Sequence, residues 1–444
     1  MSIKYYQKTS FSILFIVFLS ACQSLPFPVL QDTDKLNSEV KYEFSLKKDQ
    51  SIIGQTAEIE IQSGDSLALI ARHFGLGFDE ITQANPSIDP WIPESGHTAK
   101  LPVKFIIPHV PRKGLVLNLA AKRLFYFPNN KKHKVMTFPI GIGRKGWLTP
   151  TGKTKIIAKK KHPQWVVPRS IRLEHAKKGD PLPKVVAAGP NNPLGDYAIR
   201  LGIPGYLIHS TNKPYGVGMA VSHGCIRLYP EDMEILFEQT SIQTPVHLIN
   251  QPFLMGWHKS QLYIQAYPTP NASQTQTRKQ LARFKRKLKR IEQKSNRLIA
   301  WNKVESVISK KNGIPASIFT DSTDEELTVK FSHPSNLNNS VTPPPLTKNA
   351  WRIKVAEFST KKSAQRFTAM LNHQGPKIPT HVLSAQTGYM VIAGPFNSVE
   401  QAKSSYARLR IDFSLEPDLI VPGEKIPNIS KINNFFYSVS SFFD

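Results

Sequence analysis

The middle of the chain, from Gly114 to Asn250, is a series of short apolar stretches separated by turns. The turns contain Gly, Pro and Asn, and the stretches between them read LVLNLAAKRLFYFP, KKHKVMTFPIGIG, TKIIAK, YAIRLG, YLIHS and PVHLIN. Strands this short and this frequent are typical of a sandwich or barrel. One clear helix is predicted, at PEDMEILFEQT, where Pro230 and the acidic residues after it suit a helix N-terminus. This region therefore predicts a mainly β fold.

The first residues of the chain predict export. Lysines precede an apolar run at 11–19, which is shorter than the roughly 20 residues of a membrane-spanning helix. The run is followed by LSAC, which resembles the lipobox of bacterial lipoproteins, whose cysteine carries lipid and becomes the N-terminus after cleavage. We therefore expect a lipoprotein signal peptide at 1–21 and lipidation at Cys22. The alternative is an ordinary signal peptide with a cysteine at its cleavage site. Gln23 follows the cysteine, and the resemblance then favours the inner leaflet of the outer membrane.

Length and charge limit the number of domains and the partners. A chain of 444 residues with 40% hydrophobic residues is long enough for two to four folded domains of roughly 100–200 residues each. The formal net charge is +26, and an exported lipoprotein meets no nucleic acid. We therefore expect the basic surface to face carboxylates of the cell wall or anionic lipid headgroups.

A small α/β unit is predicted at 57–108, after a polar tether at 22–56. The segment begins with alternating apolar residues, turns at SGDS, continues with helical spacing, and makes a second short helix that stops at Pro86. We expect oxygens of Ser63 and Asp65 to cap the first helix.

This unit resembles a LysM domain at the turn from Gly64 to Leu67 and at the helix end from Ala84 to Pro86. The resemblance implies binding of glycans that contain N-acetylglucosamine. The alternative is a unit that only packs on the next domain.

The second half begins with an extension at 251–319 that carries a basic helix at 278–298. Its apolar residues form one narrow stripe, at positions 281, 284, 288 and 291. We expect this helix to dock on its own domain, ahead of forming a coiled coil or lying on an anionic membrane surface. A linker at 320–347 contains TPPPLT, which favours an extended spacer.

The last unit, 348–422, is predicted as strand, helix, two strands, helix and strand, an α+β ferredoxin-like order, before a tail at 423–444. Phe358 closes the first strand, and a Gly-Pro-Phe from Gly394 closes the third. These features resemble a SPOR domain, a family that binds glycan strands stripped of stem peptides and collects at division sites. The alternative is a ferredoxin-like domain for protein contacts.

Cys225 is the only cysteine besides Cys22. In an oxidising compartment an unpaired thiol indicates a cysteine that takes part in a reaction. A thiol nucleophile needs a base, and attack on a carbonyl needs donors for the oxyanion. His209 follows the strand YLIHS, and one loop with two glycines and a proline joins it to SHGCIR, so the two side chains are expected to face each other. Gly224 allows close backbone approach, with its amide and that of Cys225 aimed at one point.

At these residues the chain resembles the L,D-transpeptidases, whose YkuD-type catalytic domain carries a histidine, a loop and then Ser/Thr-His-Gly-Cys. The resemblance covers 111–250 and includes PIGIGRKGWLTPTG and SHGCIRLYPEDM. It implies acyl transfer: Cys225 forms a thioester with the diaminopimelate of a tetrapeptide stem, releases D-alanine and passes the stem to an acceptor amine. The implied base is His209.

The resemblance also implies roles for the neighbouring residues. The amides of Gly224 and Cys225 would form the oxyanion hole, and the carbonyl of Ser210 would orient the histidine. Arg227 is a candidate for a stem carboxylate or for local structure. Two more residues would shape the turn or bind substrate, Ser222 and His223. No step needs a metal or an organic cofactor, and the spacing of His and Cys matches no metal motif.

Three functions stay open on the sequence alone. In the first, the acceptor is a second stem, giving a 3→3 crosslink, or the terminal lysine of an outer-membrane protein. In the second, the chain is a wall-binding structural lipoprotein that bridges the outer membrane and peptidoglycan. In the third, water resolves the thioester, and the protein is a thiol hydrolase acting on stems or on wall-bound proteins. In each case we expect a lipid-anchored protein in the periplasm, which the resemblance to a SPOR domain would enrich at the division site.

Overall fold

The structure is a computed structural model that describes residues 43–426, apart from 48–49, 130–132, 178–180, 270–272, 323–327, 335–336, 338–342, 374–377, 387 and 414. The predicted signal peptide, Cys22 and most of the predicted tail lie outside these residues. Within them, no helix is long and apolar enough to cross a membrane.

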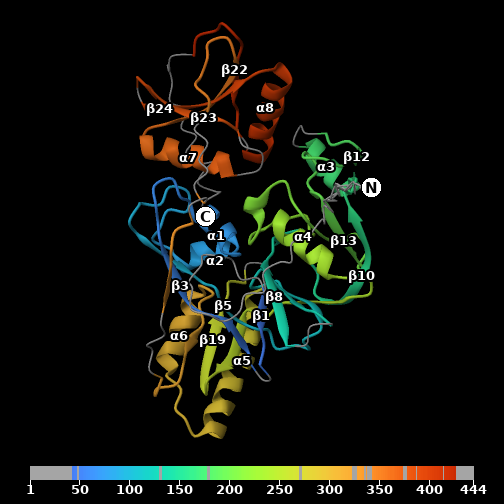
Figure 1. Ribbon diagram of the computed structural model, residues 1–444, viewed down its shortest axis with the longest axis vertical. Helices are drawn as coiled ribbons and strands as arrows, with labels where there is room; N and C mark the ends of the chain where they lie inside the picture. Colours follow the sequence, from blue (N-terminus) through green and yellow to red (C-terminus); the bar gives the residue numbers. More distant parts are fainter. Residues whose placement is uncertain are drawn as a thin grey trace, which may run out of the picture. The chain divides into compact units, whose positions relative to one another are not determined.

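A sheet of nine strands holds the predicted β region together. Its members are β1 (Glu43–Ser45), β6 (Gly114–Asn118), β7 (Arg123–Phe127), β8 (Lys134–Pro139), β10 (Gly152–Lys161), β13 (Tyr197–Leu201), β14 (Leu207–His209), β16 (Ile226–Arg227) and β17 (Pro245–Ile249). The order across the sheet is β1-β8-β7-β6-β17-β10-β13-β14-β16. Figure 1 labels β1, β8, β10 and β13 of this sheet. Two neighbouring pairs are parallel, β17 with β6 and β14 with β16. The predicted mainly β character is confirmed.

The predicted helix of this region is α4 (Pro230–Gln239), and it covers the sheet. Met233 and Leu236 of α4 are fully buried in one cluster with Ile199, Ile208 and Leu248 of the strands. The loop that follows β14 leads into β15 (Ala220–Ser222), which forms a short parallel pair with β9 (Ile142–Gly143). The sheet core therefore fixes the ends of β14 and β16 from one side.

A second helix, α3 (Arg169–Lys177), corrects the expectation of one helix in this region. It lies between β11 (Trp165–Val166) and β12 (Val185–Val186), which pair antiparallel. Only Ile171 of α3 is buried, so the helix has no apolar stripe that sequence periodicity reveals.

The segment expected to be a tether is partly folded. Its last part forms β1, which pairs with β8 at the edge of the large sheet, and β2 (Ile52–Gly54), which pairs with β5 (Lys104–Ile106). Ile52 and Ile53 are each 2% exposed. The chain therefore enters the fold from residue 43, ahead of the predicted boundary at 57.

The α/β unit at 57–108 contains β3 (Ala57–Glu60), α1 (Leu67–His73), α2 (Phe78–Ala84) and β4 (Thr98–Leu101). The predicted cap is wrong in detail: Ser66 is the N-cap of α1 and accepts from the Leu69 amide. Asp65 instead accepts from the Gln62 amide and lies 2.9 Å from Nε2 of His333.

The predicted linker also folds in part. Its residues form β21 (Val329–Phe331), which pairs parallel with β3 and completes the order β21-β3-β4. The contact of Asp65 with His333, 268 residues away, lies beside this strand. A strand of three residues and a single buried contact produce no local sequence pattern from which either could be predicted.

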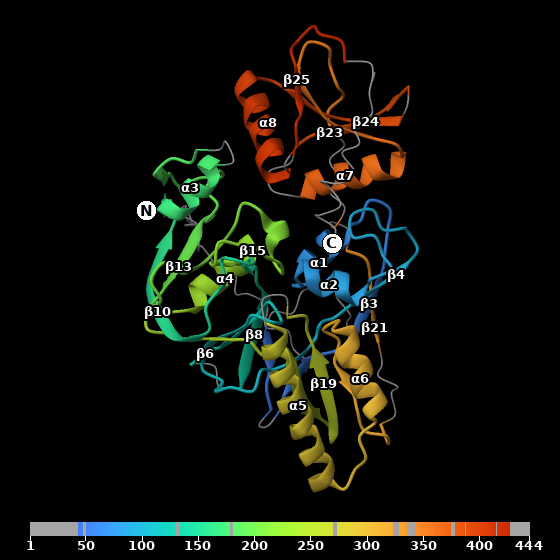
Figure 2. The same ribbon diagram turned by 180° about the vertical axis from the view of Figure 1, so that it is seen from behind.

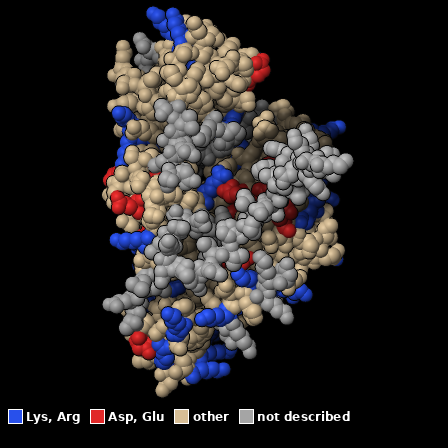
Figure 3. All heavy atoms as spheres, viewed as in Figure 1, with Lys and Arg blue, Asp and Glu red and all other residues tan. Residues whose placement is uncertain are grey.

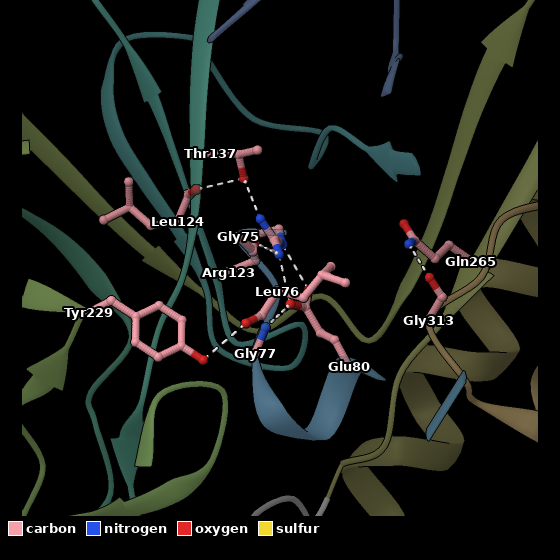
Figure 4. Close-up of polar contacts among 10 residues, drawn as sticks. All are labelled: Gly75, Leu76, Gly77, Glu80, Arg123, Leu124, Thr137, Tyr229, Gln265 and Gly313. Carbon is pink, nitrogen blue, oxygen red and sulfur yellow. Dashed lines mark hydrogen bonds and ion pairs between the residues drawn. The ribbon is translucent and has the colours of Figure 1, made fainter. Parts of the chain in front are cut away.

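Two buried polar contacts connect this α/β unit to the large sheet (Figure 4). Arg123 on β7 donates from Nε and Nη2 to the two carboxylate oxygens of Glu80 on α2, both at 2.7 Å. The hydroxyl of Tyr229, just before α4, donates to the Leu76 carbonyl at 3.1 Å. The turn between α1 and α2 is thus held against the sheet and against the start of α4.

The extension at 251–319 folds as a small unit of its own. It contains β18 (Phe253–His258), β19 (Gln261–Ala266), α5 (Gln274–Ser295), α6 (Trp301–Lys310) and β20 (Ala316–Ser317), with the sheet order β18-β19-β20 (Figure 2). Phe284 and Leu288 of α5 are buried against Ile264 and Phe319. The predicted docking of the basic helix is confirmed.

The last unit has the predicted order of elements. These are β22 (Trp351–Phe358), α7 (Lys361–His373), β23 (Thr380–Ala385), β24 (Gly388–Phe396), α8 (Val399–Phe413) and β25 (Asp418–Ile420). The sheet order β23-β24-β22-β25 is antiparallel throughout, as in a ferredoxin-like fold.

Candidate active site

His209 is the last residue of β14, and Cys225 immediately precedes the first residue of β16, its parallel neighbour. In the register of the pair, His209 lies opposite Arg227 of β16. Cys225 lies on the side of β16 where the connecting loop returns. All three side chains line one cavity. The strand pairing therefore brings together the thiol, imidazole and guanidinium that the sequence singled out.

The environment of His209 keeps its ring neutral and oriented. The side chain is 3% exposed, and its Nδ1 lies 2.5 Å from the Ser210 carbonyl oxygen. A proton on Nδ1 donates to that carbonyl and leaves the lone pair on Nε2. Burial, helped by the nearby charge of Arg227, lowers the pKa of His209 to about 3.

The thiol is also neutral in this environment. Burial raises the pKa of Cys225, while a backbone hydrogen bond at Leu207 and the charge of Arg227 act in the opposite direction. With the pKa of His209 lowered and that of Cys225 raised, the cavity holds a neutral thiol and a neutral imidazole at rest, and not a thiolate and an imidazolium. Such a histidine can accept a proton when the thiol attacks.

The turn before the cysteine is held by Ser222. Its hydroxyl donates to the Cys225 carbonyl at 2.6 Å and accepts from the Gly224 amide at 3.1 Å. Gly224 has φ +102, and a Cβ there would lie 2.9 Å from the ring of Tyr206. Glycine is therefore required. The arrangement also differs from the expected oxyanion hole, because the Gly224 amide points at the Ser222 oxygen.

His223 faces a charged pair that the sequence did not reveal. Nη2 of Arg144 lies 2.9 Å from Nε2 of His223 and donates to Oε1 of Glu174 on α3 at 2.6 Å. Oε2 of Glu174 lies 3.2 Å from the same His223 nitrogen, and Trp147 packs edge-on to the imidazole. Burial, followed by the charge of Arg144, lowers the pKa of His223. This cluster lines the same cavity as Cys225.

No metal centre is formed by the part of the chain that the structure describes. Among those residues, no group of three His, Cys, Asp or Glu side chains is placed to hold a metal ion.

Comparison with known proteins places the three folded units. A family model of the L,D-transpeptidase catalytic domain matches residues 112–248, a LysM domain model matches 59–90, and a SPOR domain model matches 347–415. A curated relative, the probable L,D-transpeptidase YbiS of Escherichia coli, is 36% identical over 250 residues, which are 55% of this chain and 76% of that protein. The chain belongs to the L,D-transpeptidase family. The predicted family and the order of its LysM and SPOR domains are confirmed.

Two further matches are covered less fully by this chain. The probable L,D-transpeptidase YcfS of Escherichia coli is 44% identical over 193 residues, which are 43% of this chain. The chain thus spans 60% of the length of that relative. Among solved structures, an L,D-transpeptidase from Mycobacterium smegmatis is 22% identical, with a TM-score of 0.25, over 33% of this chain and 61% of that one.

One further residue holds the cysteine turn, and the sequence interpretation gave it no role. Thr149 donates to the Gly224 carbonyl at 2.8 Å and accepts from the Gly143 amide at 2.9 Å. Its signal was present in the stretch PIGIGRKGWLTPTG, which the family resemblance included. Arg144 and Trp147 lie in that stretch too, whereas Glu174 lies outside it, on the helix that the sequence did not predict.

Proposed function

We propose that this protein is a peptidoglycan L,D-transpeptidase with Cys225 as nucleophile and His209 as general base. The observation that carries the proposal is the parallel pairing of β14 with β16, since it puts both side chains at one cavity. The family membership supports the reaction class. The donor we propose is a tetrapeptide stem with diaminopimelate at its third position.

In the first step, Sγ of Cys225 bonds to the carbonyl carbon of the diaminopimelate residue while its proton passes to Nε2 of His209. The carbon–nitrogen bond to D-alanine then breaks, and the same proton goes to the leaving amine. A thioester remains. In the second step, an acceptor amine gives its proton to His209, attacks the thioester and releases the Cys225 thiol.

The neutral resting pair supports this course. Because the pKa of His209 is lowered to about 3, its ring is unprotonated at neutral pH, and its lone pair is free to accept the proton of the attacking thiol. The Ser210 carbonyl keeps the ring in the tautomer that presents Nε2. When the imidazolium forms during attack, this carbonyl also stabilises it.

The oxyanion and the stem need donors as well. We assign the oxyanion to the Cys225 amide, joined by the Gly224 amide once it leaves Ser222. Arg227 lines the cavity opposite His209 and is our candidate for a stem carboxylate. Ser222 and His223 act by shaping the turn.

The other modules suggest how the enzyme reaches its substrate. We propose that the LysM and SPOR domains bind glycan strands of peptidoglycan, and that lipid on Cys22 anchors the chain to the periplasmic face of the outer membrane. The SPOR domain would enrich the enzyme at the division site. The acceptor we favour is the side-chain amine of a second stem, and the lysine of an outer-membrane protein is the other acceptor.

The test uses the chain from Gln23 to Asp444, which keeps every described residue. It is incubated with purified tetrapeptide muropeptides, with and without a tripeptide muropeptide as acceptor, and products are identified by mass spectrometry. We expect D-alanine release and a 3→3 dimer, both absent with Cys225→Ala. Tripeptide as the sole product would identify a hydrolase, and no D-alanine release at all would refute the enzyme and favour a structural lipoprotein.

A further inference from the structure

Helix α5 has one face in the core and a broad face in solvent. Phe284 and Leu288 are buried, and Leu281 and Ile291 pack against the same cluster. Most of the remaining side chains of the helix are exposed, and more than half of these are basic. We call the following eight exposed side chains the basic face: Arg278, Lys279, Arg283, Arg286, Lys287, Lys289, Arg290 and Lys294.

Nearby acidic residues do not neutralise the basic face. Glu292, the one acid of α5, accepts from the Ile299 amide and from the Trp301 indole. Glu305 pairs with Lys285, and Asp321 pairs with Arg297. Between 251 and 321 the chain has fourteen Lys or Arg and three Asp or Glu, a net charge of +11 out of +26 for the whole chain. Figure 3 shows Lys and Arg gathered at the lower end of the view, where Figure 1 places α5.

Two large apolar side chains are exposed near the end of the same helix. Trp257, at the end of β18, is 39% exposed, and its ring packs 5.8 Å from that of Phe319. Leu298, three residues after α5, is 70% exposed, and its carbonyl accepts from the Thr320 amide next to Phe319. Arg297 lies over the Phe319 ring as well. Trp257 and Leu298 therefore lie around Phe319, next to Arg297 and the C-terminal end of α5.

We propose that the basic face, Trp257 and Leu298 form a docking surface for a membrane rich in anionic phospholipid. Basic side chains near an anionic bilayer are attracted to its headgroups, and tryptophan prefers the boundary between headgroups and acyl chains. Wall carboxylates would attract the basic face equally, but they offer no apolar phase for Trp257 and Leu298. The chain therefore carries a second membrane contact, independent of any lipid on Cys22 and of the reaction at Cys225.

The experiment is cosedimentation of the chain from Gln23 to Asp444 with vesicles. We expect binding to vesicles of phosphatidylethanolamine and phosphatidylglycerol, little binding to phosphatidylcholine alone, and release in about 1 M salt, where charges are screened beyond about 3 Å. The variant Arg283→Gln/Lys287→Gln/Arg290→Gln/Lys294→Gln keeps helix propensity and should lower the partition coefficient about tenfold or more. Leu298→Ser should lower it severalfold.

The control replaces four exposed lysines outside this unit, Lys47, Lys113, Lys153 and Lys155, by glutamine, which changes the net charge equally. The control should bind vesicles nearly as well as the parent chain. Equal loss in both quadruple variants, or equal binding to neutral vesicles, would overturn the proposal. So would a basic-face variant that loses binding to purified sacculi while keeping its binding to vesicles. Muropeptide turnover in solution should be unchanged in the basic-face variant, so this result stays separate from the proposed function.

Discussion

Arg123 of the transpeptidase sheet and Glu80 of the LysM domain form an ion pair whose side chains are 1% and 8% exposed. The same guanidinium also donates to the Gly75 carbonyl at 2.9 Å and lies 3.9 Å from the centre of the Phe105 ring. The LysM helices are thus joined to the catalytic domain through a buried, fully bonded charge. In this structure the LysM domain contacts the catalytic domain directly, through Glu80 and the Gly75 carbonyl.

Removing one partner of this pair leaves the other charge buried. We expect Arg123→Leu to lower the free energy of unfolding by about 3–5 kcal/mol, measured by urea denaturation. The control is Arg72→Ala, which removes the ion pair with Glu231, where the side chains are 41% and 40% exposed. That change should cost at most about 1 kcal/mol. Equal effects of the two variants would mean that Glu80 and Arg123 are not buried together in solution.

The LysM domain also contacts the loop that joins the two proposed catalytic residues. The Phe78 amide donates to the Val217 carbonyl at 3.1 Å, and a Cβ on Gly218 would lie 2.3 Å from the Gly77 Cα. We expect Gly218→Ala to separate these backbones, to shift the loop before Cys225 and to lower kcat about tenfold or more.

Gly96→Ala is a matched control for this prediction. Gly96 has φ +86 against φ +85 for Gly218, but a Cβ at Gly96 meets no atom within 4 Å. It should therefore cost only the strain of a left-handed alanine, about 1–2 kcal/mol, and leave kcat unchanged. Similar kcat values for the two variants would show that the loop does not depend on the LysM contact.

Sequence patterns predicted the parts of this fold that are long or locally signalled. The strands of the catalytic domain, the helix at Pro230 and the docking stripe of α5 each have an apolar period that reads without tertiary information. β1, β2 and β21 do not, because they are three residues long and are stabilised by partners far along the chain. Asp65 shows the same limit: its turn position indicated a helix cap, and its contact is with His333, 268 residues later.

The site was predictable to a similar extent. The motif and its loop predicted that His209 and Cys225 belong to one site. The sequence could not predict the direction of the Gly224 amide, because that depends on the Ser222 rotamer. The role of Glu174 could not be predicted, because α3 buries a single residue and therefore has no apolar stripe from which the helix could be predicted.

Burial of His209 predicts a specific pH dependence of stability. Its pKa falls from 6.5 to about 3 in the folded state, so between these values the unfolded chain binds a proton that the folded chain does not. The free energy of unfolding should then fall as the pH falls from about 6.5 towards 3, by up to about 1.4 kcal/mol per pH unit from this group. His209→Gln removes the titration, and urea midpoints of the variant should fall less steeply over this range. Parallel curves for parent and variant would contradict a buried neutral histidine.

Cys225 is the residue on which the proposed chemistry depends. Cys225→Ser should abolish transfer, because a serine hydroxyl is a far weaker acid than a thiol and gives up its proton to an imidazole much less readily. Family membership leads us to expect that a carbapenem acylates the parent chain once, at Cys225. Intact-mass measurement and peptide mapping test this, and an adduct on another residue or residual transfer by the serine variant would refute the assignment.

Thr149 should act as a positioning residue for Cys225. Its buried hydroxyl bridges the Gly143 amide and the Gly224 carbonyl, so it fixes the peptide just before the thiol without lining the cavity. Thr149→Val removes both hydrogen bonds at nearly constant volume. We expect kcat to fall about tenfold or more while KM for the muropeptide donor stays within about twofold, since the stem contacts are unchanged.

Thr149→Ser keeps the hydroxyl and should restore most of kcat. A valine variant with normal kcat, or a serine variant as slow as the valine one, would show that the hydroxyl does not hold the Cys225 turn.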